Sequence, residues 1–173
     1  IDTVVLDKTG TLTTGEMTAI APILHSDISA DAAVRLAASV EAASEHPTAK
    51  ALVRYALATG VETAPVDGFR AVPGLGVSGY VDGDRVVVGN AHLLEQNSIK
   101  VPVADFGPGT TIYVAQGTTL VAEFHLNDTV RTSAASAVEQ IKALGLRPIL
   151  LSGDSPGPSE SLAAFLGIEE VIS

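Results

Sequence analysis

Residues Val4 to Thr13, with the sequence VVLDKTGTLT, decide the fold of this chain. An apolar run that ends in Asp7, followed by Gly10 and small hydroxyl residues, is how a buried strand delivers a carboxylate to its exposed carboxyl end. The backbone N–H groups and hydroxyls beyond Asp7 suit the close approach of a phosphate, because Gly10 accepts unusual dihedral angles. Asp7 is therefore a candidate nucleophile, and a strand followed by a plain polar turn is the alternative.

The composition indicates a folded, acidic α/β protein. Of the 173 residues, 46% are hydrophobic and 17% charged, which is enough core for one domain or two small ones. The formal net charge is −10, so most of the surface would repel a phosphate backbone, and we expect no nucleic-acid partner. An acidic site that handles nucleotides usually recruits a divalent cation, for which Mg²⁺ is the natural candidate.

Several other classes of protein are disfavoured. The chain has no Cys, which excludes disulfides, thiolate metal sites and cysteine nucleophiles. No apolar run approaches the ~20 residues that cross a bilayer, and no signal peptide precedes the first strand, so we expect the chain itself to be soluble. Strands begin close to both ends, at Ile1 and at Glu169 to Ile172. This predicts a piece of a longer protein.

Hydrophobic periodicity divides the chain into three stretches. Residues 1–15 form a strand and the nucleophile loop. Residues 16–124 contain two helical stretches and then short β-branched runs, with an antiparallel hairpin expected at Asp82-Gly83. Residues 125–173 alternate helix, strand and helix, as in a parallel doubly wound sheet. We predict an incomplete α/β domain of residues 1–15 and 125–173, into which an α+β domain of residues 16–124 is inserted as an antiparallel sheet flanked by helices.

Individual elements follow from the same patterns. Ser29 or Asp31 is expected to cap the first helix, and Pro47 opens the second. Pro156 and Pro158 predict a stiffened turn before the last helix. The expected helices are Asp31–Ser44, Pro47–Leu57, Val130–Leu144 and Leu162–Leu166, and the expected strands after the first are Ala71–Val72, Val77–Val81, Arg85–Val88, Thr111–Ala115, Leu120–Phe124 and Pro148–Leu151.

Two motifs carry a family resemblance. The string DKTGTLT, complete from Asp7 to Thr13, resembles the phosphorylation signature of P-type ATPases, and Ser44-Glu45-His46-Pro47 resembles the SEHP motif of their heavy-metal-transporting branch. A histidine beside a helix start is by itself more often a cap or a solvated residue. The resemblance implies that His46 packs near the adenine ring of ATP and that Glu41 accepts a hydrogen bond from its amino group.

A glycine pair and a Gly-Asn step belong to the same resemblance. Gly74-Leu75-Gly76 alone predicts a β-turn. In the resembled family the pair lets the backbone approach the nucleotide, and a Gly-Asn step closes the same pocket, so we expect Gly74, Gly76, Gly89 and Asn90 at the ATP site. A Cβ at Gly74 or at Gly76 is expected to intrude on the ligand and weaken ATP binding without unfolding the domain.

Two further motifs lie in the last third of the chain. Asp128 and Arg131 resemble the D-x-x-R element at the hinge of the family, and we assign them to cofactor binding; a helix cap with a local ion pair is the alternative. Ser152 and Asp154 follow an apolar strand and resemble the T-G-D-N motif, with Ser152 retaining a hydroxyl that can donate to a phosphoryl oxygen. Ser155 departs from that pattern.

The resemblance implies a mechanism. Asp7 would attack the γ-phosphate of ATP in line and form an aspartyl-phosphate, and the catalytic set would also include Lys8, Thr9, Ser152 and Asp154. Mg²⁺ would bridge Asp7, the Thr9 carbonyl and the phosphate. Soluble phosphatases of the wider haloacid dehalogenase superfamily carry an Asp two residues after the nucleophile as general acid and base. Thr9 cannot take that role, which favours a long-lived phosphoenzyme.

The longer protein would then be an ATP-driven heavy-metal pump. The resemblance implies membrane helices, an actuator domain and a transported metal such as copper, with this chain as a cytoplasmic domain at the cell membrane of a prokaryote. A Lys and a magnesium-binding loop of the family would follow Ser173, so we expect the chain alone to be monomeric, to bind nucleotide and to phosphorylate weakly or not at all. The alternatives are a soluble haloacid-dehalogenase-type phosphatase and a non-catalytic nucleotide-binding module.

Overall fold

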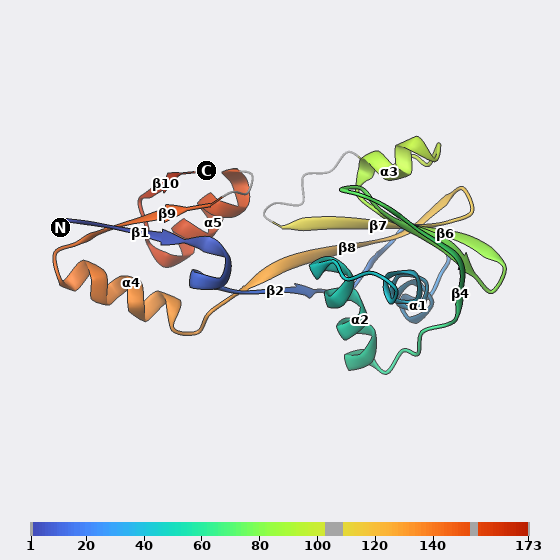
Figure 1. Ribbon diagram of the computed structural model, residues 1–173, viewed down its shortest axis with the longest axis horizontal. Helices are drawn as coiled ribbons and strands as arrows, with labels where there is room; N and C mark the ends of the chain where they lie inside the picture. The colour runs from blue at the N-terminus through green and yellow to red at the C-terminus, as the bar shows by residue number, and fades with distance from the viewer. Residues whose placement is uncertain (1, 103–108, 153–155, 173) are drawn as a thin grey trace. The chain divides into compact units, whose positions relative to one another are not determined.

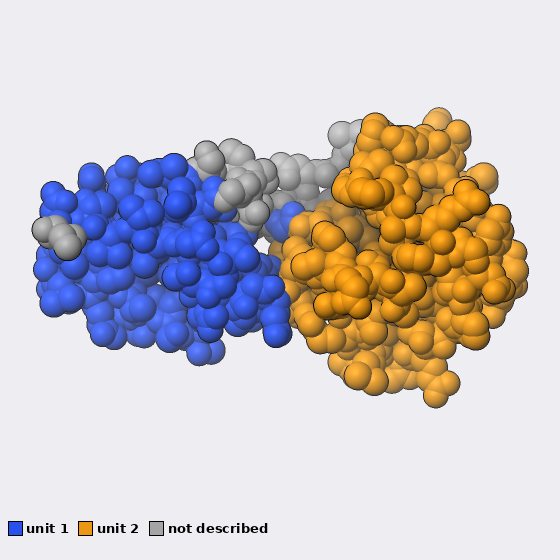
Figure 2. Space-filling view, in the orientation of Figure 1, with its two compact units in different colours: residues 1–16, 106–109, 128–173 blue, residues 17–105, 110–127 orange. Residues whose placement is uncertain are grey.

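The computed structural model describes residues 2–102, 109–152 and 156–172, and these form two compact units (Figure 2). Of the described residues, unit 1 contains 2–16, 109, 128–152 and 156–172, and unit 2 contains 17–102 and 110–127. The chain passes into unit 2 after Glu16 and returns after Asn127, where the sequence placed the two boundaries after residues 15 and 124.

Unit 1 is a parallel sheet with helices on one face. Its strand order is β1-β9-β10. The connections from β1 to β9 and from β9 to β10 cross in the same direction along the sheet. Because such connections between parallel strands are right-handed, both helices lie on the same face. Leu6, Leu150 and Val171 pack there against the helices, while Val5, Leu151 and Ile172 are exposed. The elements are β1 (Thr3–Asp7), the irregular turn η1 (Lys8–Leu12), α4 (Ala134–Ala143), β9 (Arg147–Leu151), α5 (Pro156–Leu166) and β10 (Glu170–Ile172).

Unit 2 is built on an antiparallel sheet of order β2-β8-β7-β6-β5-β4, with β3 also paired to β8. The β5–β6 hairpin turns at Asp82 and Gly83, both with positive φ, as the Asp-Gly signal predicted. The strands are β2 (Thr13–Ala19), β3 (Ile23–Leu24), β4 (Val66–Val72), β5 (Gly76–Val81), β6 (Asp84–Gly89), β7 (Thr110–Gln116) and β8 (Thr119–Val130).

Helices cover both faces of this sheet (Figure 1). The helices α1 (Ala30–Glu41) and α2 (Pro47–Thr59) pack on the face that carries Val86 and Val88, and the short α3 (Ala91–Gln96) packs on the face that carries Val87. Both faces of β6 are therefore buried, which explains its continuous run of valines.

The predicted fold class is confirmed, and several element bounds are corrected. Ser29 caps α1, accepting from the Ala32 N–H at 3.1 Å. The helix expected from Val130 begins only at Ala134, because β8 continues to Val130. The helix α5 begins at Pro156, so the two prolines lie in its first turn, where a missing N–H is tolerated, and not in a turn before it. The helix α3 and the strands β2 and β3 were not predicted.

Candidate nucleotide cavity and nucleophile loop

Asp7 and Ser152 lie at the carboxyl edge of the unit 1 sheet. Asp7 is the last residue of β1 and pairs with Leu151, the last residue of β9, so that Ser152 follows directly beside it. Asp7 is exposed, whereas Ser152 is buried and its N–H donates to the Ile172 carbonyl at 2.9 Å. The carboxyl edge of a parallel sheet is where open α/β folds bind ligands. Asp154 lies outside the described residues.

The turn after Asp7 is irregular. Lys8 is buried, and the Thr13 N–H donates to its carbonyl. Asp128 and Arg131, expected at the nucleotide, both hydrogen-bond to residues of this loop in unit 1, and neither lines the cavity of unit 2. The cavity therefore gives no support for the cofactor-binding role expected of these two residues, which stays a prediction.

A cavity of about 280 Å³ lies in unit 2 and collects six of the predicted residues. They come from the end of α1, the start of α2, the β4–β5 turn and the β6–α3 junction. The predicted residues that line it are Glu41, His46, Gly74, Gly76, Gly89 and Asn90. The other lining residues are Ser44, Thr48, Ala71, Val72, Pro73, Leu75, Val77, Thr110 and Ile112. Mostly apolar walls with a few polar groups are typical of a small-molecule site.

Glu41 is the acidic group of this cavity. Its residue is only 4% exposed, and burial raises the pKa of its carboxyl from the usual 4.5 to about 7, although a hydrogen bond from Ser44 opposes the shift. It therefore titrates close to neutral pH. Among the described lining residues there is no Lys or Arg, so the cavity offers shape, apolar contact and hydrogen bonds and no fixed positive charge.

His46 is held by the start of α2. It is the N-cap residue, and its Nδ1 accepts from the Thr48 N–H at 3.3 Å and lies 2.7 Å from Thr48 Oγ1. An Nδ1 that accepts leaves the ring proton on Nε2 in the neutral imidazole. Pro47 starts the helix immediately after His46. The hydrogen bonds of the cap therefore fix the ring of His46 at the cavity wall.

The glycines of the cavity have two different roles. Gly76 and Gly89 are opposite each other on β5 and β6, and a Cβ on Gly76 would collide with the Val88 carbonyl and the Gly89 Cα. The expectation that this Cβ would meet the ligand without disturbing the domain is therefore wrong: it would push apart two paired strands. Gly74 has a φ of +75° and open space where a Cβ would point, so only its backbone conformation favours glycine.

Asn90 connects the β4–β5 turn to α3. Its Oδ1 accepts from the Leu93 N–H at 3.0 Å, its Nδ2 donates to the Gly74 carbonyl at 3.2 Å, and its N–H donates to the Leu75 carbonyl at 2.9 Å. Asn90 is thus the N-cap of α3 and a tie for the cavity wall. The sequence placed it in the pocket, but its capping role depends on a helix that the sequence did not predict.

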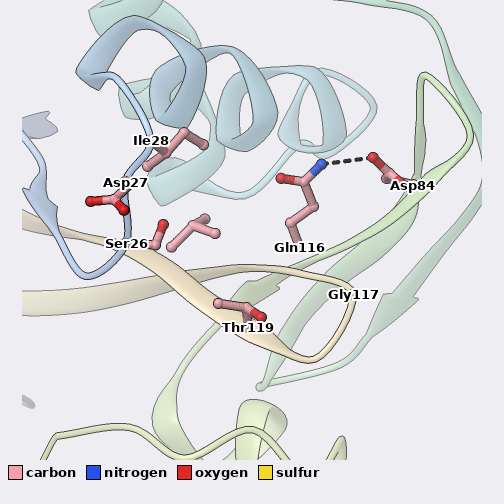
Figure 3. A pocket seen from close by; sticks show the side chains of 8 residues that line it. Ser26, Asp27, Ile28, Asp84, Gln116, Gly117 and Thr119 are labelled. Atoms are coloured by element: carbon pink, nitrogen blue, oxygen red, sulfur yellow. Dashed lines mark hydrogen bonds between the residues drawn. The ribbon is translucent and has the colours of Figure 1, made fainter.

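A second hollow, of about 530 Å³, lies elsewhere in unit 2 (Figure 3). It is lined by residues before α1, residues around the β7–β8 turn and Asp84 at the start of β6. The Gln116 amide donates to Asp84 at 2.8 Å. No residue expected to carry function lines it. The hollow therefore supports no assignment.

Comparison with known proteins defines the class first. Residues 1–173 match the haloacid dehalogenase-like hydrolase family, and the chain belongs to that family. Within it, the chain is 37% identical to copper-transporting ATPase 2 of Rhizobium meliloti (strain 1021) and 38% identical to the silver exporting P-type ATPase of Salmonella typhimurium. Each match covers 99% of this chain and 22% of the relative, so the chain spans less than a quarter of these proteins.

Solved structures agree with the sequence relatives. A zinc-transporting PIB-type ATPase in its E2.Pi state matches with a TM-score of 0.82 and 30% identity, over 99% of this chain and 29% of that one. The catalytic domain of the CPx-ATPase CopB-B, studied for its conformational changes upon nucleotide binding, matches with a TM-score of 0.77 and 32% identity, over 100% and 61%. These likenesses confirm the resemblance to heavy-metal-transporting P-type ATPases.

Proposed function

We propose that this chain is the catalytic region of an ATP-driven heavy-metal cation pump, in which unit 2 binds ATP and Asp7 of unit 1 accepts the phosphate. The observation that carries the proposal is the convergence of Glu41, His46 and the two Gly-containing segments on one cavity. These residues come from three separate segments of the sequence, 41–46, 74–76 and 89–90. Their meeting in a ligand-sized cavity is what a nucleotide site requires.

The cavity suits a purine ring. Its apolar walls and the imidazole of His46 would contact the flat faces of adenine, and the Glu41 carboxylate would accept from the exocyclic amino group. The ionised carboxylate makes this a charge-assisted hydrogen bond, whereas the protonated carboxyl group accepts as a neutral oxygen and more weakly. Because no cation lines the cavity among its described residues, the base and not the phosphate chain is the group that it recognises.

The chemistry is assigned to the edge of the unit 1 sheet. A carboxylate oxygen of Asp7 would form a bond to the γ-phosphorus as the bond from that phosphorus to the β–γ bridging oxygen breaks and ADP leaves. Thr9, two residues later, has no carboxyl group with which to activate water. A slow second step, hydrolysis of the aspartyl-phosphate by water, would give a pump time to change conformation.

Mg²⁺ is the proposed cofactor of this step. The exposed Asp7 carboxylate and the Thr9 carbonyl are oxygen ligands of the kind that Mg²⁺ prefers, and Mg²⁺ commonly uses one or two carboxylates together with substrate phosphates. The described residues contain no group of three or more acidic, His or Cys side chains that could hold a metal. The ion would neutralise charge on the phosphates.

The remaining parts of the pump are proposed from its relatives. In the described ranges of the chain, no helix has the length and apolar character needed to cross a membrane. From the transporters that the chain resembles, we place the membrane helices, the actuator domain and the path of the metal ion in other parts of the longer protein, with this region on the cytoplasmic side. The exposed Val5, Leu151 and Ile172 support a further element that covers this face, because both faces of a parallel sheet are normally covered.

Calorimetric titration with ATP tests the nucleotide site. The unchanged chain is expected to bind ATP saturably, and Glu41→Ala to weaken binding by tenfold or more, since a charge-assisted hydrogen bond is lost. Glu45→Ala is the matched control, because Glu45 belongs to the same motif but its side chain is 93% exposed and outside the cavity. Equal affinities of the two variants would reject the assignment.

Labelling with ATP that carries a radioactive γ-phosphate tests the acceptor. Acid-stable label is expected on Asp7 and not on Asp7→Asn, while both proteins bind ATP with affinities within twofold. Rapid release of phosphate from phosphomonoesters, with Asp7 intact, would instead establish the soluble phosphatase. ATP binding with no label, even after extension of the chain by its natural sequence, would leave a binding module.

A further inference from the structure

The loop after Asp7 is held in place by hydrogen bonds to Asp128 and Arg131. Thr9 is extended (φ −79°, ψ 121°) and Gly10 is left-handed (φ 81°, ψ −13°), so the turn is not a regular helix, although the Thr13 N–H donates to the Lys8 carbonyl across it. Asp7 itself is extended, with ψ of 144°. The direction in which its carboxylate leaves the sheet edge therefore depends on the contacts that the loop makes with other parts of unit 1.

The Thr13 hydroxyl provides the first of these contacts. Its Oγ1 accepts from the Gly10 N–H at 3.3 Å, and it lies 2.6 Å from Asp128 Oδ2 and 3.0 Å from the Lys8 carbonyl. The hydroxyl has one proton, and its contact with Asp128 is the shorter of the two contacts with acceptors. We therefore assign the proton to the bond with Asp128, so that the hydroxyl links that carboxyl group to the backbone of Gly10.

Arg131 provides the second set of contacts. Its backbone N–H donates to the Leu12 carbonyl at 2.9 Å, its Nε to the Thr13 carbonyl at 3.0 Å and its Nη2 to the Gly10 carbonyl at 2.9 Å. A guanidinium is planar, and its donors point in fixed directions. Two carbonyls bound to one guanidinium, with a third bound to its backbone, allow the loop little freedom.

Asp128 has a buried oxygen atom that lowers the stability of the fold. Its Oδ1 is buried and has no hydrogen-bond partner in the described part of the chain. A buried acceptor without a partner lowers stability, so a carboxyl group is a costly choice if it acts only as a cap. The cost favours a function for this group at the loop that it contacts.

We propose that Thr13, Asp128 and Arg131 form a loop latch, a set of positioning residues that fixes the backbone of residues 8–13 and thereby aims the Asp7 carboxylate. The latch gives Asp128 and Arg131 a positioning role that differs from the nucleotide contact expected from sequence. Thr13 is the first residue of β2, Asp128 lies near the end of β8, and Arg131 follows β8 directly. The relevance of the latch to phosphorylation rests on the proposed role of Asp7, but its test does not.

Amide hydrogen exchange in the 173-residue chain tests the latch. Thr13→Val removes the hydroxyl and keeps the shape, and we expect residues 9–12 to exchange at least tenfold faster while the amides of β9 keep their rates. Thr13→Ser is expected to restore slow exchange in the loop. Arg131→Gln, a change at an exposed side chain, is expected to act on the same amides, so the test does not depend on one variant folding.

Amide hydrogen exchange also provides the control and the outcomes that would contradict the latch. Thr14→Val removes the neighbouring hydroxyl, which is exposed and accepts only from the Glu16 N–H among the hydrogen bonds described for it, and should change loop exchange by less than twofold. Unchanged loop exchange in Thr13→Val and Arg131→Gln, or equal acceleration in the loop and β9, would overturn the proposal. Failure of the unchanged chain to bind ATP would reject the proposed function, while the exchange rates would still decide the latch.

Discussion

The two candidate sites are built by different physics. The cavity of unit 2 is enclosed by packed apolar walls, and Glu41 is the one acidic side chain among its described lining residues. The nucleophile loop of unit 1 lies at an exposed strand tip and is held by directed hydrogen bonds, three of them from Arg131. The comparison teaches that packing volume and burial determine the shape and polarity of the cavity, whereas the directions of hydrogen bonds determine the position of the loop that carries the nucleophile.

The largest expected effect comes from adding the volume of a side chain at Gly76, in the wall of the cavity. Gly76→Ala should lower the free energy of unfolding of unit 2 by about 3 kcal/mol, because its Cβ meets the backbone of β6. Urea denaturation followed by tyrosine fluorescence measures this, since all three tyrosines lie in unit 2. Gly74→Ala, with open space around its Cβ, should cost only about 1 kcal/mol through its positive φ. Equal losses would contradict the packing account.

Burial of Glu41 predicts that the stability of unit 2 depends on pH. Its pKa is raised by burial from 4.5 to about 7 in the folded chain, so the folded state binds more protons than the unfolded state between these values. The stability that the neutral carboxyl contributes is complete below pH 4.5 and is lost as pH rises through 7, by up to about 3 kcal/mol. Denaturation at several pH values should show the decline, and Glu41→Gln should remove most of it. Glu45→Gln should leave it in place.

Two substitutions of His46 distinguish its role in nucleotide binding from its role as the N-cap of α2. His46→Asn keeps an N-cap side chain but loses the imidazole, and His46→Ala loses both. Each should weaken ATP binding about tenfold, close to 1.4 kcal/mol, while only His46→Ala should also lower stability by about 1 kcal/mol. Calorimetric titration and urea denaturation of the same samples distinguish the two roles. An Asn variant with full affinity would show that the ring does not contact the nucleotide.

The smallest effect is expected at the surface of unit 1. Arg147 and Glu170 form an ion pair at 3.5 Å with both side chains largely exposed. Arg147→Ala should change the free energy of unfolding of unit 1 by less than about 0.5 kcal/mol, because water and salt screen such a pair. Hydrogen exchange of β9 amides measures it, and a larger loss would mean that the sheet of unit 1 depends on charge as well as on packing.

Part of this architecture could be predicted because the signals are local. Pro47 and Ser29 sit where helices begin, and Asp82-Gly83 turns the β5–β6 hairpin. The helix α3 was missed because its six residues are too few to show a helical period. The true start of α4 was missed because Asp128 to Val130 pair in β8 before the helix begins. The motifs located the cavity residues, but the reason for glycine at Gly76 came only from its partner strand.

By itself, the sequence determined the chemistry that is available and the local turns that present it: an aspartate at a strand tip, a histidine at a helix start and glycines at turns. These depend on neighbours along the chain, whose dihedral preferences are intrinsic. Only the tertiary structure decided which of these groups meet, how deeply Glu41 is buried and which carbonyls Arg131 holds. Such properties arise from contacts between residues far apart in the chain, and burial and hydrogen-bond geometry exist only once those contacts form.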